Sequence, residues 1–160
     1  MKTKNTWRTI GGKQFDNKIE QLVEQAIINE QSKGHRLKIC VGTDSQGYKG
    51  YTVYASVVVI LREGKGGFMF IRNEKETQKR TVKERMINEV GKSVEVAYSI
   101  CDILDKYNVE LEVHADINTD PQFKSNPALK DAMGYIMGMG FVFKAKPYAF
   151  ASSSCADKVV

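Results

Sequence analysis

The spacing of hydrophobic and polar residues predicts one helix followed by three strands in the first half of the chain. Residues 16–33 place apolar side chains on one helical face, with Asp16 as the N-cap and a glycine directly after the helix. Residues 37–41, 51–61 and 67–72 are apolar runs, the second of them rich in β-branched residues, and glycine-containing turns separate them. Short connections of this kind join antiparallel strands, so we expect a meander.

The second half of the chain alternates between helical and strand spacing, which predicts strands connected by helices. A strand that is reached through a helical crossover runs parallel to its neighbour in the sheet. We therefore expect an α/β fold with a mixed five-stranded sheet, three antiparallel strands and then two parallel ones, flanked by helices. The first strand would lie centrally, next to the fourth. The elements predicted in this half are a helix over 78–105, a strand over 109–117, a helix over 127–138, a strand over 141–148 and a last helix from Ser152 or Ser153 to Val160.

A length of 160 residues, 42% of them hydrophobic, suits one domain with a substantial core. We expect residues 1–36 to form an N-terminal extension and helix that pack on the core, and residues 37–160 to form the main domain. No apolar run approaches the ~20 residues that span a bilayer, and residues 1–13 lack the apolar stretch of a signal peptide. These features predict a cytoplasmic protein without a membrane partner.

The formal net charge of +5 is compatible with a polyanionic partner but does not identify one. Three widely separated cysteines, Cys40, Cys101 and Cys155, lack the CxxC spacing of a zinc site, which favours buried thiols. A basic segment over 72–85 is interrupted by three glutamates, so a phosphate-binding patch and an ordinary solvated face both stay open. Its cationic residues are Arg72, Lys75, Lys79, Arg80, Lys83 and Arg85.

Acidic residues stand where two of the predicted strands end. Asp44 ends the first strand, and Asp116 ends the fourth. If these strands are parallel neighbours ~4.8 Å apart, both carboxylates leave the sheet at the same edge, where α/β proteins commonly bind ligands. Paired carboxylates can hold a divalent cation there, although an aspartate at a strand end also commonly caps a turn. The pair is therefore more informative than either residue alone.

Two further acids lie on predicted helices. Glu89 borders the apolar stripe of the helix over 78–105, whereas Glu84 lies farther round it, so Glu89 is the better candidate to face the sheet. Asp157 lies in the first turns of the last helix, where the helix dipole alone would also favour an acid. Hydrolysis of a phosphodiester by two hard cations about 3.5–4 Å apart needs carboxylate ligands of this kind. The sequence offers no Ser-His-Asp or Cys-His arrangement that competes with them.

The sequence Thr43-Asp44-Ser45 at the end of a central first strand resembles the start of the ribonuclease-H-like nucleases. The βββ-α-β-α-β-α order over residues 37–160 is similar to that superfamily as well. More closely, the chain resembles the YkuK family within it. The stretches that carry this resemblance are Val41–Gln46, Glu84–Glu89, His114–Ile117, Gly134–Phe141 and Lys146–Ser153, the last running into Ala156-Asp157.

The resemblance implies a metal-dependent nuclease that hydrolyses phosphodiester bonds in RNA, DNA or an RNA/DNA hybrid. Asp44, Glu89, Asp116 and Asp157 would be its catalytic residues and the ligands of Mg²⁺ or Mn²⁺. Two alternatives stay open. One is a module of the same fold that binds nucleic acid or protein without cutting. The other is half of a sugar-kinase or actin-type ATPase, which needs Gly/Thr-rich phosphate loops and two such domains.

Several residues near these acids admit either a functional or a structural role. His114 shares a strand face with Asp116, and it either moves protons there or makes a structural hydrogen bond. Lys144 and Lys146 share one face of the last strand, where they either contact phosphates or remain solvated. The aromatic residues that either stack on bases or pack against the protein are Trp7, Tyr48 and Tyr51.

Overall fold

The antiparallel meander predicted from the first half of the chain forms the centre of the sheet in the computed structural model, which describes residues 6–118 and 127–160. β3 (Leu37–Tyr48) pairs with β4 (Tyr51–Arg62) along its whole length, and β4 pairs with β5 (Gly66–Glu76). β-Branched residues fill much of β4, where they pack well on the pleated surface. β3 is longer than predicted because its pairing with β4 continues through the polar residues that follow the apolar run.

Parallel strands extend the sheet on the other side of β3, as the helical crossovers predict. β6 (Glu110–Asn118) pairs with β3, and β7 (Val142–Lys146) pairs with β6. The sheet has seven strands rather than the predicted five, in the order β2-β1-β5-β4-β3-β6-β7. The additional strands, β1 (Trp7–Arg8) and β2 (Gln14–Phe15), contain two residues each, so they are too short for an alternating pattern to reveal them.

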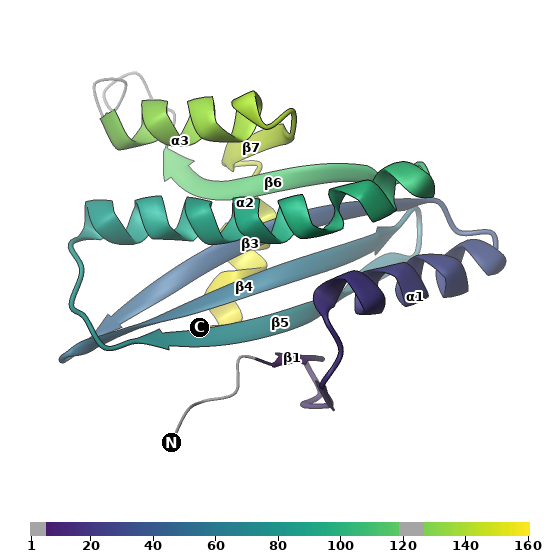
Figure 1. Ribbon diagram of the computed structural model, residues 1–160, viewed down its shortest axis with the longest axis horizontal. Coiled ribbons are helices and arrows are strands. Elements are labelled where there is room, and N and C mark those ends of the chain that lie inside the picture. The colour runs from purple at the N-terminus through teal and green to yellow at the C-terminus, as the bar shows by residue number, and fades with distance from the viewer. Residues whose placement is uncertain (1–5, 119–126) are drawn as a thin grey trace.

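Helices cover both faces of the sheet (Figure 1). α1 (Ile19–Ser32), α2 (Val82–Lys106) and α3 (Pro127–Gly138) lie on one face, and the C-terminal segment lies on the other. The N-cap of α1 is Lys18, so the predicted cap at Asp16 is wrong. No helix in the described residues is long and apolar enough to cross a membrane.

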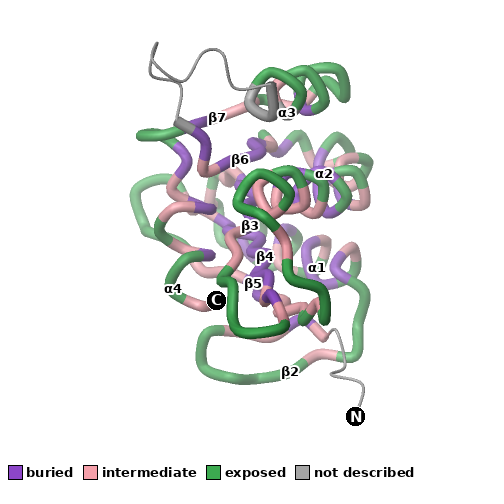
Figure 2. The backbone as a smooth tube through the Cα atoms, turned by 90° about the vertical axis from the view of Figure 1, so that its left-hand side faces the viewer, coloured by how far each residue is buried: buried purple, intermediate pink, exposed green. Residues whose placement is uncertain are grey.

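The C-terminal segment forms a π-helical turn, η2 (Ala151–Ala156), followed by one short turn of α-helix, α4 (Asp157–Val159). A single last helix was predicted there. Because consecutive residues of a strand point to opposite faces, β3 contributes to two cores. Ile39 packs with α1 and α2, whereas Cys40 packs with η2. Figure 2 shows the strands buried between these two layers.

Candidate metal centre

Asp44 and Asp116 lie at the same edge of the sheet, at the carboxyl ends of the parallel strands β3 and β6. The ladder between these strands ends at the pair Gly42 and His114, and each aspartate follows two residues later on its own strand. Residues two apart on a strand share a face, so both aspartates project on the face that η2 covers. They lie close enough for the charge of Asp116 to contribute to raising the pKa of Asp44.

Asp157 joins these two residues from α4. Its carboxyl group makes a side-chain hydrogen bond with that of Asp44, which requires one proton shared between the two groups. Burial and this contact with Asp157 raise the pKa of Asp44 to about 7. The backbone N–H of Ser45 opposes that rise by donating to Asp44 Oδ1 at 2.9 Å. Two carboxylates this close repel each other when both are charged, so this position favours a bound proton or a cation.

Glu89 approaches the same point from α2. Its carboxylate accepts a hydrogen bond from the hydroxyl of Ser45, the residue next to Asp44. Burial raises the pKa of Glu89 to about 7, and repulsion by Asp44 and Asp116 adds to the rise. Sequence reasoning missed Ser45 as an orienting group, although its position beside Asp44 places its side chain on the helix-covered face. The structure thus brings together the four acids that the sequence nominated, Asp44, Glu89, Asp116 and Asp157.

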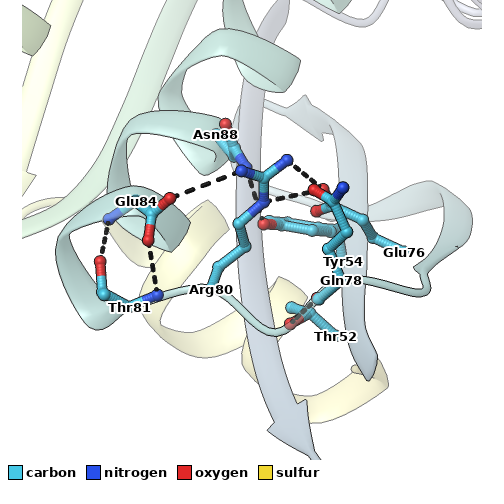
Figure 3. A network of polar contacts seen from close by, with 8 residues as sticks. All are labelled: Thr52, Tyr54, Glu76, Gln78, Arg80, Thr81, Glu84 and Asn88. Atoms are coloured by element: carbon cyan, nitrogen blue, oxygen red, sulfur yellow. Dashed lines mark hydrogen bonds and ion pairs between the residues drawn. The ribbon is translucent and has the colours of Figure 1, made fainter. Parts of the chain in front are cut away.

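Glu84 does not join this cluster, because it caps the N-terminus of α2. The backbone N–H of Thr81 donates to the Glu84 carboxylate at 3.0 Å, and the backbone N–H of Glu84 donates to Thr81 Oγ1 at 3.1 Å. Arg80 Nη1 lies 3.4 Å from Glu84 Oε2, and Figure 3 shows the Glu84 side chain turned toward Thr81 and Arg80. The hydrogen bonds from Thr81 lower the pKa of Glu84. This capping box also starts the helix at Val82 rather than at the predicted residue 78.

Asp116 carries a buried oxygen that lies against a cationic side chain. Asp116 Oδ1 accepts no hydrogen bond from the described residues, although Lys146 Nζ lies 2.9 Å away as an ion pair. A buried carboxylate is costly without a positive partner, and the Lys146 ammonium is that partner for Asp116 in the metal-free protein. The neighbouring acids offer carboxylate oxygens, the ligands that Mg²⁺ and Mn²⁺ prefer. The chemistry of these side chains fits a hard divalent cation, although among the described residues no three of the four acids have oxygens within 4.8 Å of one another.

A second cluster of metal-ligand types, Cys40, Glu112 and His114, lies buried beside this edge, with its ligand atoms within 4.8 Å of one another. His114 Nδ1 accepts from the backbone N–H of Ala151 at 3.1 Å, so Nε2 carries the proton and donates to Glu112 Oε1 at 3.0 Å. Lys38 Nζ lies 3.3 Å from the other oxygen of Glu112. Burial raises the pKa of the Cys40 thiol to about 12, which disfavours the thiolate that a metal would need.

These contacts make the second cluster a structural network rather than a reactive one. Glu112 and His114 satisfy each other, and the Ala151 contact ties β6 to η2. Of the two roles that the sequence left open for His114, the structure shows the hydrogen-bonding one. Sequence reasoning missed the contact of Cys40 with Glu112, because it joins residues on two separate strands. The alternation of polar residues along β6 is the signal in the sequence that could have indicated a buried polar network.

Gly42 lets η2 contact β3 directly, and Gly42→Ala is expected to destabilise the protein by about 1–3 kcal/mol. A Cβ atom at this position would lie 2.5 Å from Ser152 N and 2.6 Å from Ala151 C. The π-helical turn would have to move, and Asp157 would move with it. Urea unfolding in EDTA measures the loss. Gly91→Ala is the matched control, because its new Cβ meets nothing within 4 Å in the exposed part of α2.

The control variant is expected to be as stable as the parent or to gain up to about 1 kcal/mol from the better helix propensity of alanine. A Gly42→Ala protein with the stability of the parent would show that η2 can shift away from β3 without cost. In that case the glycine does not fix the position of Asp157.

The other candidate residues from the sequence are either packed against the protein or exposed. Trp7 is buried, with the Arg72 guanidinium 4.9 Å from its ring centre, so it packs against the protein. Lys144 lies opposite His114 in the ladder between β6 and β7, and Lys146 pairs with Asp116. Arg80 of the basic segment pairs with acidic side chains, as a solvated face would.

Comparisons with known proteins find a family and individual proteins to which this chain is similar. A family model described as "Ribonuclease H-like" matches residues 18–160. The "Uncharacterized protein YkuK" of Bacillus subtilis (strain 168) is 28% identical over 134 residues, which cover 75% of this chain and 77% of that protein. Among solved structures, the RNase H1 from the halophilic archaeon Halobacterium salinarum NRC-1 matches with a TM-score of 0.43 and 14% identity. That match covers 77% of this chain and 99% of the archaeal one.

Proposed function

The chain belongs to the ribonuclease H-like family, and on this premise we propose that it is a metal-dependent nuclease that hydrolyses phosphodiester bonds in nucleic acid. The matches confirm the resemblance to that family and to YkuK, and the family indicates a nuclease-type function. One observation carries the finer proposal. The acids Asp44, Glu89, Asp116 and Asp157 converge from four separate elements at one sheet edge.

Asp44, Ser45 and Lys146 have distinct parts in the proposed site. Asp44 takes the central position because it contacts Asp157 and lies near both Asp116 and Glu89. Ser45 fixes the orientation of Glu89 through its hydroxyl hydrogen bond. A bound Mg²⁺ or Mn²⁺ would supply charge stabilisation at the phosphate and an activated water. Displaced from Asp116, the Lys146 ammonium would be free to bind a phosphate oxygen.

Mn²⁺ and Mg²⁺ are expected to raise the melting temperature of the protein and to support cleavage of at least one nucleic acid. A ligand bound only by the folded state stabilises it, by about 2.7 kcal/mol at a hundredfold excess over its Kd. The measurement combines thermal melts with cleavage of labelled RNA, DNA and RNA/DNA hybrid. Each substrate is incubated with Mg²⁺, with Mn²⁺ and, as the control, with EDTA.

The ion pair between Lys146 and Asp116 favours a second candidate function. Because the ammonium already neutralises one acid, the fold can persist without a metal and act as a module that binds nucleic acid. Melts that respond to neither cation, together with binding and no cleavage, would support that module. The same result would overturn the nuclease proposal.

A further inference from the structure

The C-terminal segment covers only part of the sheet face that carries Asp44. η2 packs on the middle of β3, and Asn73 Nδ2 on β5 donates to Val159 O of α4 at 2.9 Å. Farther along β3, Gln46 and Tyr48 are exposed and share the face of Asp44, because alternate residues of a strand point the same way. Figure 1 shows the hairpin of β3 and β4 reaching past the end of β6. Within the described residues, the face beside the carboxylates is therefore open toward the hairpin tip.

Two tyrosines and a lysine form a stacked group on this open face, and we refer to Tyr48, Tyr51 and Lys75 as the hairpin platform. Tyr48 and Tyr51 lie opposite each other in the ladder, with ring centres 4.9 Å apart and an interplanar angle of 13°. Lys75 Nζ lies 4.2 Å from the centre of the Tyr51 ring. Because β4 lies between β3 and β5, Tyr51 is flanked on both sides. Tyr48 is the outer ring, and 42% of its surface is exposed.

Three lysines lie in the hairpin platform or in the segments next to it along the chain. Lys49 lies in the turn between β3 and β4, Lys75 lies on β5, and Lys79 follows β5 in an exposed position. In the part of the chain that the structure describes, none of the three has a carboxylate within ion-pair distance. An exposed aromatic ring among lysines is typical of surfaces that bind single-stranded nucleic acid, by stacking on bases and by attracting phosphates.

We propose that Tyr48 stacks on an unpaired base of a single-stranded nucleic acid segment whose phosphates contact Lys49 and Lys75. The proposal rests on the proposed nuclease function and narrows its substrate. In the interior of a duplex both faces of a base are covered by its neighbours, so an aromatic ring of this kind selects unpaired nucleotides. The hairpin platform would hold the strand that enters the carboxylate site.

The spacing between the platform and the carboxylates suits such a strand. Tyr48 lies four residues beyond Asp44, which is about 13 Å along an extended strand at ~3.3 Å per residue. That span corresponds to about four stacked nucleotides at ~3.4 Å each. A base stacked on Tyr48 would therefore lie a few nucleotides from the phosphodiester at Asp44.

A protein partner fits this face less well. Gln46, Lys49 and glycines border the two rings, whereas the centre of a protein interface is depleted of charged residues and of lysine in particular. Exposed apolar side chains such as Tyr135, Met137 and Val142 lie instead on α3 and β7. Charge and stacking geometry thus favour a nucleic acid as the occupant.

The test measures the affinity of the protein for a labelled oligothymidylate and for a blunt-ended, fully paired DNA duplex, in EDTA and at low salt. Tyr48→Ala is expected to weaken oligothymidylate binding by about five- to a hundredfold, the usual contribution of one base stacked on one aromatic ring. Its affinity for the duplex is expected to stay the same. Tyr48→Phe keeps the ring and is expected to bind as the parent does. Tyr98→Ala removes a tyrosine that is 65% exposed on α2 and serves as the matched control.

Several outcomes would overturn the proposal. They are an unchanged oligothymidylate affinity in Tyr48→Ala, an equal loss for both ligands, and a parent protein that binds neither. The parent protein could also self-associate in sedimentation experiments. If Tyr48→Ala abolishes that self-association, the face binds a second copy of the chain instead. Because binding is measured without metal, the platform can fail while Mn²⁺-dependent cleavage is observed. Equally, cleavage can fail while Tyr48 still governs binding, so the two failures are distinguishable.

Discussion

Asp44→Asn is expected to abolish metal-dependent cleavage while making the metal-free protein more stable above about pH 7. Asparagine keeps the shape of the side chain and removes the charge that a cation requires. The expected loss in rate is about a thousandfold, the equivalent of several kcal/mol of charge stabilisation. Without a cation the same charge is unfavourable, because burial and contact with Asp157 raise the pKa of Asp44 to about 7. Removing it relieves this penalty in the alkaline range.

The two effects are measured separately, as cleavage rates in Mn²⁺ and as urea unfolding in EDTA near pH 8. Asp16→Asn removes an exposed aspartate ahead of α1 and is expected to change neither quantity. If the Asp44→Asn protein cleaves at the rate of the parent, Asp44 is not part of the catalytic site. A variant that unfolds at lower urea in EDTA would contradict the electrostatic account of the cluster.

The position of Asp44 beside Asp116 could be predicted because two local signals combine with one rule of topology. Each aspartate follows an apolar run, and the helical spacing between the runs forces the two strands to be parallel. Parallel neighbours end at the same edge of the sheet, so the pairing follows without any knowledge of side-chain contacts. The same reasoning places β3 at the centre of the sheet, as observed.

Other features could not be predicted, because they depend on contacts between distant residues or on very short elements. The bond between Cys40 and Glu112 joins residues 72 positions apart, whereas a periodic pattern reports only which face a residue occupies. β1 and β2 contain two residues each, which is too few for an alternating pattern to be recognised. The π-helical turn η2 differs from an α-helix by its hydrogen-bond pattern, which apolar spacing does not encode.

For the choice between Glu84 and Glu89, the sequence contains a stronger signal than the angular positions of the two residues on the helix. Helical angles separate Glu89 from Glu84 only modestly, because a small rotation of the helix could absorb the difference. The spacing Thr81-x-x-Glu84 ahead of an apolar run is the signature of a capping box, and the structure contains that box. A glutamate engaged in a cap is not available to the sheet edge, which leaves Glu89.

Glu89→Gln and Glu84→Gln are therefore expected to have opposite effects. Glu89→Gln removes a proposed ligand, so Mn²⁺ affinity should fall about tenfold or more and cleavage should be lost with it. In EDTA near pH 8 the same variant should be more stable than the parent, since burial makes the charged Glu89 unfavourable. Glu84→Gln weakens the capping box and its ion pair with Arg80, so it should lower stability while leaving Mn²⁺ affinity unchanged.

The pH dependence of stability distinguishes these variants further. The folded-state pKa of Glu89 is about 7 against an ordinary value of 4.5, so its contribution to stability is complete below about pH 4.5 and is lost as the pH rises through 7. The parent in EDTA should lose stability over this range, Glu89→Gln should lose less, and saturating Mn²⁺ should restore the stability of the parent.

For Glu84 the folded-state pKa is lowered, so its contribution to stability is present above the ordinary pKa and is lost in acid. Unfolding in urea across this pH range measures both. If Glu84→Gln loses the Mn²⁺ response and Glu89→Gln keeps it, the helix acid at the site is Glu84.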